Sequence, residues 1–188
     1  QEVYLKCSGA TANDNTNMIK WVECEIGGQK IDKHYSQWLD IYNELFETSH
    51  DYRTVMNTGS GTVADKDNDV HAVTAYVPLR FWFNRNPGLA LPLIALQYHE
   101  VKINMTLNDK TKVKFAASDA GTCTPTLSSA DLLVNYVYLD TDERRRFAQV
   151  SHEYLIEQVQ HTGVESEATI DMNFNHPVKA LFWRGKAW

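Results

Sequence analysis

The apolar, proline-punctuated stretch at residues 76–103 constrains the fold of this chain more than any other feature. It is rich in aromatic and aliphatic side chains, and it contains the turn sequence Asn86-Pro87-Gly88 between two further prolines, Pro78 and Pro92. Proline has no backbone N–H to donate to a sheet, so β-structure tolerates it only at strand starts, edges or bulges. The stretch therefore predicts several short strands that turns interrupt and redirect. Its residues favour a structural role over a chemical one.

Composition excludes several classes of function. The 188 residues are 43% hydrophobic and 22% charged, which is typical of a globular protein with a sizeable core. The formal net charge of −6 does not suit a protein that binds a nucleic-acid backbone through clustered Lys and Arg. The basic run at 144–146 has acidic neighbours, so we interpret it as a solvated helix face or a subunit contact. We expect no transmembrane segment, because no run approaches the ~18 apolar residues of a membrane-spanning helix.

The three cysteines, Cys7, Cys24 and Cys123, are widely separated and form no Cys-x-x-Cys pair. An odd number at such spacing predicts neither a disulfide framework nor a zinc site, and it favours a reducing compartment. The chain begins at Gln1, without an initiator Met, and ends just after an apolar run. We therefore expect it to be a piece of a longer protein.

Two periodic patterns in the first third predict a hairpin followed by a helix. Alternating apolar residues lead into Gly27-Gly28 within residues 18–31, which is typical of a β-hairpin with a tight primed turn. From His34 to Glu47 the apolar and aromatic residues repeat at helical spacing, which predicts a helix with Asp32 or Ser36 as its cap. Cys24 falls on the apolar face of the hairpin and is expected to behave as a small hydrophobe.

The remaining patterns predict a mostly β chain with a few short helices. Strands are expected at 75–83, 101–107, 132–139, 153–160, 170–174 and 178–183, loops at 57–71 and 118–129, and a helix at 140–149. The strand at 132–139 carries apolar residues on both faces, which predicts burial on both sides. Asp140 begins the helix with the spacing of a capping box. The pattern favours an all-β jelly roll or sandwich.

No combination of residues predicts catalysis, a cofactor or a metal ion. His99-Glu100 and His152-Glu153 lack the second histidine that a His-Glu-x-x-His zinc site needs at i+4, where Ile103 and Ile156 stand instead. Both pairs are expected on strands, so the consecutive residues of Ser151-His152-Glu153 point to opposite faces and make no triad. The remaining histidines, which show no paired spacing, are His34, His50, His71, His161 and His176.

Four blocks of the sequence resemble one protein family in the same order. They are residues 76–103, residues 21–35, residues 139–149 running into 152–158, and residues 173–183. In these blocks the chain resembles the major capsid proteins of nucleocytoplasmic large DNA viruses, particularly the algal-virus type. The blocks cover well over a third of the chain.

The resemblance implies a non-enzymatic structural protein of the virion. Members of the family carry two jelly rolls in tandem, and three subunits form a pseudo-hexameric capsomer of an icosahedral shell. By resemblance, residues 1–139 are later strands of the first jelly roll, 140–150 a helical junction, and 151–188 opening strands of the second. The partners implied are two further copies, neighbouring capsomers and minor capsid proteins, with synthesis in the host cytoplasm and no direct contact to nucleic acid.

Two other functions suit an all-β chain. A β-sandwich surface module that binds a carbohydrate or another ligand shares the strand pattern, but it should be complete as a monomer. A jelly-roll enzyme of the cupin kind requires His and carboxylate ligands gathered inside a barrel.

Overall fold

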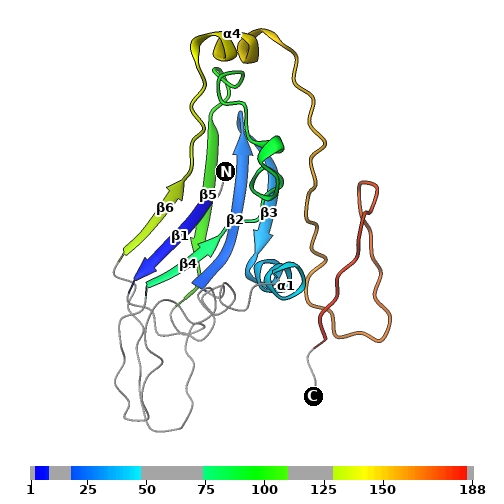
Figure 1. Cartoon of the computed structure of the whole chain (residues 1–188). Helices are drawn as coiled ribbons and strands as arrows, with labels where there is room; N and C mark the ends of the chain where they lie inside the picture. Colours follow the sequence, from blue (N-terminus) through cyan, green and yellow to red (C-terminus); the bar gives the residue numbers. More distant parts are fainter. Residues whose placement is uncertain (1–2, 9–17, 48–73, 110–128, 186–188) are drawn as a thin grey trace. The chain divides into compact units, whose positions relative to one another are not determined.

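The computed structural model describes residues 3–8, 18–47, 74–109 and 129–185 (Figure 1). The chain divides into two compact units, Gln1–Gln158 and Val159–Trp188. The helices and strands of the described residues lie in the first unit, where strands predominate and the helices are short, as predicted.

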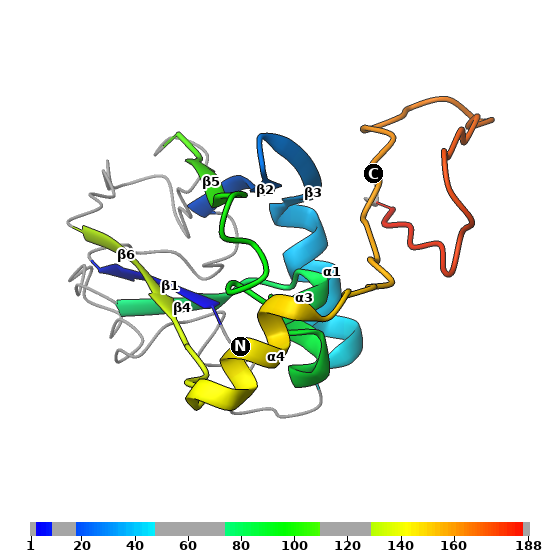
Figure 2. The same cartoon turned by 90° about the horizontal axis from the view of Figure 1, so that it is seen from above.

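The described strands of the first unit form two antiparallel sheets. One sheet has the order β4-β1-β6, formed by β4 (Thr74–Pro78), β1 (Val3–Ser8) and β6 (Ser129–Val134). The other has the order β3-β2-β5, formed by β3 (Gln29–Tyr35), β2 (Ile19–Ile26) and β5 (Val101–Leu107). Figure 2 shows the two sheets as separate layers. Among the described strands, β2 and β3 alone are joined by a short turn, whereas the other paired strands lie far apart in the sequence. Long connections between paired strands are typical of jelly rolls rather than meanders.

The hairpin predicted within residues 18–31 is confirmed as β2 and β3. Gly27 and Gly28 have φ values of 59° and 83°, which is the left-handed backbone of a tight primed turn. The N–H of Gly27 also donates to the carbonyl of Glu100 at 3.0 Å. The turn thus contacts the start of β5 as well as joining its own strands.

The apolar core gathers side chains from β2, α1, β4 and the residues that follow β4. Its buried members are Met18, Ile19, Val22, Cys24, Leu39, Val77, Leu79, Phe81, Trp82 and Phe83. Ile19 and Val22 are three residues apart, so strict alternation would place them on opposite faces. The β2–β5 pairing shifts register between Ile19 and Trp21, and this bulge lets both side chains reach the core.

The predicted helix is confirmed as α1 (Ser36–Phe46). The predicted capping residues are wrong, because Asp32 lies within β3 and Ser36 is already helical. The N-cap residue is Tyr35, and its side chain makes no capping hydrogen bond among the described residues. Leu39 is buried as the predicted apolar stripe requires, whereas Leu45 and Phe46 are exposed. The helix therefore packs along a shorter contact than its sequence indicates.

The predicted strand at 75–83 is wrong beyond Pro78. The chain turns into the short helices α3 (Trp82–Arg85) and η2 (Pro87–Leu89), where Asn86 accepts from the N–H of Gly88 and fixes the expected turn. Three consecutive aromatic residues, 81–83, are all buried, which a strand with alternating faces does not allow. Side chains support the turn, since the Asn84 amide donates to the carbonyl of Leu79 at 2.7 Å.

The later strand predictions are only partly confirmed. β5 matches the predicted strand at 101–107. The strand predicted at 132–139 is observed only up to Val134, the end of β6. Its apolar residues are exposed within the described structure, so the predicted burial on both faces is wrong. Described residues 150–185 contain no strand, which contradicts the predictions at 153–160, 170–174 and 178–183. A strand needs a partner for its backbone groups, and within the described residues these segments form no ladder with another segment.

The helix at the expected junction is confirmed as α4 (Thr141–Gln149). Asp140 accepts from the N–H of Glu143 at 2.8 Å, which is the predicted N-cap. The predicted loop at 57–71 and all but Ser129 of the loop at 118–129 lie outside the described residues, as do Cys123, His50 and His71. Within the described ranges, the structure has no helix long and apolar enough to cross a bilayer.

Candidate functional site

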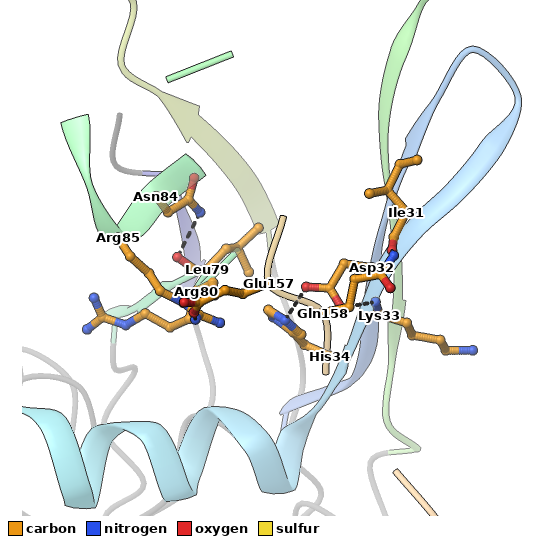
Figure 3. A network of polar contacts seen from close by, with 10 residues as sticks. All are labelled: Ile31, Asp32, Lys33, His34, Leu79, Arg80, Asn84, Arg85, Glu157 and Gln158. Carbon is orange, nitrogen blue, oxygen red and sulfur yellow. Dashed lines mark hydrogen bonds and ion pairs between the residues drawn. The ribbon is translucent and has the colours of Figure 1, made fainter. Parts of the chain in front are cut away.

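The most buried polar pair of the described structure consists of Asp32 and His34. They lie two residues apart on β3, so both point to the same face of the strand. Both side chains are fully buried, and Nε2 of His34 lies 2.8 Å from Oδ2 of Asp32 (Figure 3). The other carboxylate oxygen accepts from the N–H of Lys33, and the imidazole stacks on the ring of Phe81 at 4.6 Å.

Cys24 is paired with Asp32 across the β2–β3 ladder, so a thiol, an imidazole and a carboxylate lie near one another. This arrangement does not make a nucleophile. Burial, with a smaller effect of the Asp32 carboxylate, raises the pKa of the Cys24 thiol from 9.0 to about 12. A reactive cysteine needs a lowered pKa and access to substrate, whereas this thiol is protonated and buried. Cys24 thus behaves as the small hydrophobe that the sequence predicted.

Two arginines, one in the loop after β4 and one at the end of α3, approach one aromatic ring of α1. The guanidinium carbons of Arg80 and Arg85 lie 5.1 Å and 5.5 Å from the ring centroid of Tyr42. Arg80 pairs with Glu47, at the end of α1, and Arg85 pairs with Glu157 at 2.8 Å. Arg85 also donates through Nε to the carbonyl of Arg80 at 2.9 Å. This cluster joins α1, α3 and a segment far along the chain.

That segment, residues 150–158, is here called the docked segment. It is extended and belongs to no sheet among the described residues, and three of its side chains contact the rest of the first unit. The Tyr154 hydroxyl donates to the carbonyl of Ala90 at 3.2 Å, and the Gln158 amide donates to the carbonyl of Ile31. Glu157 pairs with Arg85, and Figure 3 shows this pair and Gln158. Three side chains of the segment thus contact α3, β3 and the residue that follows η2.

The histidine–glutamate pairs considered in the sequence lie outside strands, contrary to expectation. His99 and Glu100 lie in the turn before β5, and His152 follows α4, where its Nε2 lies 2.7 Å from the carbonyl of Phe147. The structure does not bring these residues together with one another or with Asp32 and His34. Among the described residues, no group of three His, Cys, Asp or Glu side chains is arranged to hold a metal ion.

Sequence reasoning missed both polar features of the site. The pairing of Asp32 with His34 had a signal, because the Gly27-Gly28 hairpin predicts a strand on which residues two apart share a face. The ion pair of Arg85 with Glu157 joins positions 72 residues apart and has no signal in one sequence.

Exposed apolar side chains gather on β6 and on the residues that follow it. They are Leu132, Leu133, Val134, Tyr136, Val137 and Tyr138. β6 is an edge strand of its sheet within the described residues, so it presents unpaired backbone groups along with these side chains. Such a surface is typical of a contact with another domain or subunit.

Comparisons with known proteins agree on one family. Residues 5–140 match the family model of the major capsid protein N-terminus, and residues 143–187 match that of the large eukaryotic DNA virus major capsid protein. The chain is 57% identical over 185 residues to the major capsid protein of Pyramimonas orientalis virus, covering 95% of this chain and 45% of that protein. It is 44% identical over 190 residues to that of Paramecium bursaria Chlorella virus 1, covering 93% of this chain and 42% of that protein.

A solved structure gives the same result for the fold. The chain superposes on a quasi-atomic model of the PBCV-1 virus capsid with a TM-score of 0.71 at 40% identity, covering 94% of this chain and 46% of that one. The two antiparallel sheets and their long connections therefore define a jelly-roll β-sandwich, as predicted. The chain belongs to the major capsid protein family of large eukaryotic DNA viruses. It spans less than half the length of the curated relatives described above.

Proposed function

We propose that this chain is part of a structural virion protein, the major capsid protein of a large DNA virus, and that it has no enzymatic activity. The observation that carries the proposal is the 57% identity to a major capsid protein over 185 residues, which includes both family regions. Within the described part of the chain, Cys24, Asp32 and His34 resemble a catalytic set, and the buried, protonated thiol supports a packing role for them.

The proposed domain organisation assigns residues 1–139 to the first jelly roll, 140–150 to a helical junction and 151–188 to the start of a second. Two observations support it: the two family models meet between residues 140 and 143, and α4 occupies Thr141–Gln149. In this organisation, the partners of the strands predicted after residue 150 come from the part of the relatives that this chain does not span.

The proposed assembly is a homotrimer. Three copies of a subunit with two similar domains give a six-lobed outline, which tiles a flat facet while using only three-fold closure. The exposed apolar residues of β6 and of positions 136–138 support a role in contacts between domains or subunits. We propose neighbouring capsomers and minor capsid proteins as further partners, synthesis in the host cytoplasm, and no direct nucleic-acid contact, in keeping with the net charge of −6.

Light scattering and negative-stain electron microscopy of the full-length protein test this proposal. A stable trimer with a six-lobed outline is the expected result. A protein that stays monomeric at micromolar concentration would contradict the capsomer and favour the carbohydrate- or ligand-binding surface module instead. Stoichiometric iron, manganese or zinc in the purified protein would favour the cupin-like enzyme.

A further inference from the structure

The docked segment is held in an unusual way for an extended chain. Extended segments are normally stabilised by backbone ladders to neighbouring strands, which distribute the stabilisation over many hydrogen bonds. Residues 150–158 form no such ladder among the described residues. The side chains of Glu157, Tyr154 and Gln158 contact α3, Ala90 at the end of η2, and β3. A few side chains therefore decide whether the segment stays in place.

Arg85 is the best-anchored partner in this set. Its Nη1 donates to Oε2 of Glu157 at 2.8 Å, its Nε donates to the carbonyl of Arg80 at 2.9 Å, and its guanidinium lies over Tyr42. The Arg85 side chain is 19% exposed and that of Glu157 is 39% exposed, so solvent screens the ion pair chiefly on the carboxylate side. The contacts with Arg80 and Tyr42 hold the guanidinium in the orientation that meets Glu157, which limits the side-chain entropy lost in forming the pair.

The same aromatic ring connects a second pair to this anchor. Tyr42 also lies under Arg80, whose guanidinium pairs with Glu47 at the end of α1. α1 therefore supports the position of Arg85 through Tyr42. Removal of the Tyr42 ring is expected to loosen the docked segment even though Tyr42 lies on another element.

We infer that Arg85 is a positioning residue that holds residues 150–158 on the first jelly roll through Glu157, and so fixes the point from which the second unit starts. Val159, the first residue of that unit, directly follows Gln158. A chain that left α4 without these contacts would move on a tether of about nine residues, which spans roughly 30 Å when extended. The consequence for a second jelly roll rests on the proposed domain organisation, whereas the docking itself does not.

Limited proteolysis of the full-length protein with chymotrypsin tests the inference, because the segment contains cleavable bonds after Tyr154 and Leu155 and a protease needs a released chain. The variants are Arg85→Glu, Glu157→Arg and the double variant, in which the charges are exchanged. Each single variant is expected to speed cleavage after Tyr154 or Leu155 about tenfold, while cleavage within β2, after Trp21, stays slow. The double variant is expected to return cleavage to within about threefold of the original protein.

The matched control is Arg145→Glu, which breaks the exposed Arg145–Asp142 pair on α4, where the side chains are 66% and 92% exposed. It should leave cleavage within 150–158 unchanged. Unchanged cleavage in both single variants would overturn the inference, and so would an equal rise in cleavage within β2, which would mark Arg85 as a general stability residue. If Arg85→Glu fails to fold, Gln158→Ala decides: faster cleavage within 150–158 supports the docking, and unchanged cleavage overturns it.

Light scattering on the same samples keeps the two proposals separate. A monomeric original protein would count against the capsomer without affecting the proteolysis result. A trimeric original protein whose variants are cleaved within 150–158 no faster than the original would count against the role of Arg85 alone.

Discussion

Replacing Gly27 by alanine perturbs the β2–β3 turn in two ways that can be measured separately. An L-residue in the left-handed region costs about 1–2 kcal/mol, and Gly27 and Gly28 share this cost because both have positive φ. A Cβ added at Gly27 would also lie 2.6 Å from Nδ1 of His99, whereas at Gly28 no described atom lies within 4 Å. The second effect is therefore specific to Gly27.

The size of the second effect follows from the exposure of His99. Its ring lies at the surface and can rotate away, and an off-rotamer side chain costs about 0.5–1.5 kcal/mol. Gly27→Ala should thus lower the free energy of unfolding by about 2–3 kcal/mol and Gly28→Ala by about 1–2 kcal/mol. The reduced entropy of the unfolded chain partly offsets both losses, and it cancels in their difference.

Urea denaturation of the full-length protein, followed through the transition of the unit that contains β2 and β3, measures these losses. The deciding experiment is a double-mutant cycle with His99→Ala, which removes the ring and should bring the cost of Gly27→Ala down to that of Gly28→Ala. Equal losses from the two glycine variants, or a Gly27→Ala loss that persists when His99 is alanine, would refute the steric argument.

Three further predictions concern the core. Phe81→Ala should lower the free energy of unfolding by about 3–5 kcal/mol, because Phe81 is fully buried against His34. Tyr98→Ala, at a 93% exposed position, should change it by less than about 0.5 kcal/mol. Similar losses for the two variants in urea denaturation would contradict the assigned core. Asp32→Ala leaves the buried His34 without the Asp32 carboxylate and should lower the free energy of unfolding by about 3 kcal/mol. Asp32→Asn keeps an acceptor and should lower it by less. A lower unfolding midpoint for Asp32→Asn than for Asp32→Ala would contradict the pairing. The Cys24 thiol has a folded pKa of about 12, above its unfolded value of 9.0, so the folded state binds its proton more tightly and stability should fall as pH rises from about 9 to about 12. Cys24→Ala should lack this part of the pH dependence, and a thiol reagent should react with Cys24 at pH 8 only after unfolding; prompt reaction in the native protein would show that burial is incomplete.

Features set by neighbouring residues could be predicted from the sequence. Gly27-Gly28 determined the hairpin, because only a backbone with two positive φ values makes so tight a turn. The helical spacing from His34 to Glu47 determined α1, and Asp140 determined the start of α4. Each depends on residues within a few positions of one another, where local geometry limits the choices.

Strand predictions failed where the outcome depended on a partner. The alternation at 75–83 gave no sign that Phe81, Trp82 and Phe83 would all be buried, because side chains from Asn84 and Arg85 support a turn that a local pattern does not encode. The apolar alternation after residue 150 indicated strands, but alternation marks a face that can be buried and does not supply a neighbouring strand.

By itself the sequence determined the all-β class, the tight turn, the two longer helices and the family to which the chain belongs, since these follow from local periodicity or from ordered blocks of residues. Only the tertiary structure decided that Asp32 and His34 are buried together and that Arg85 meets Glu157. The physical reason is that burial and ion pairing depend on which distant segments the fold brings within a few ångströms. A single sequence records the charges of such residues but not their separation in space.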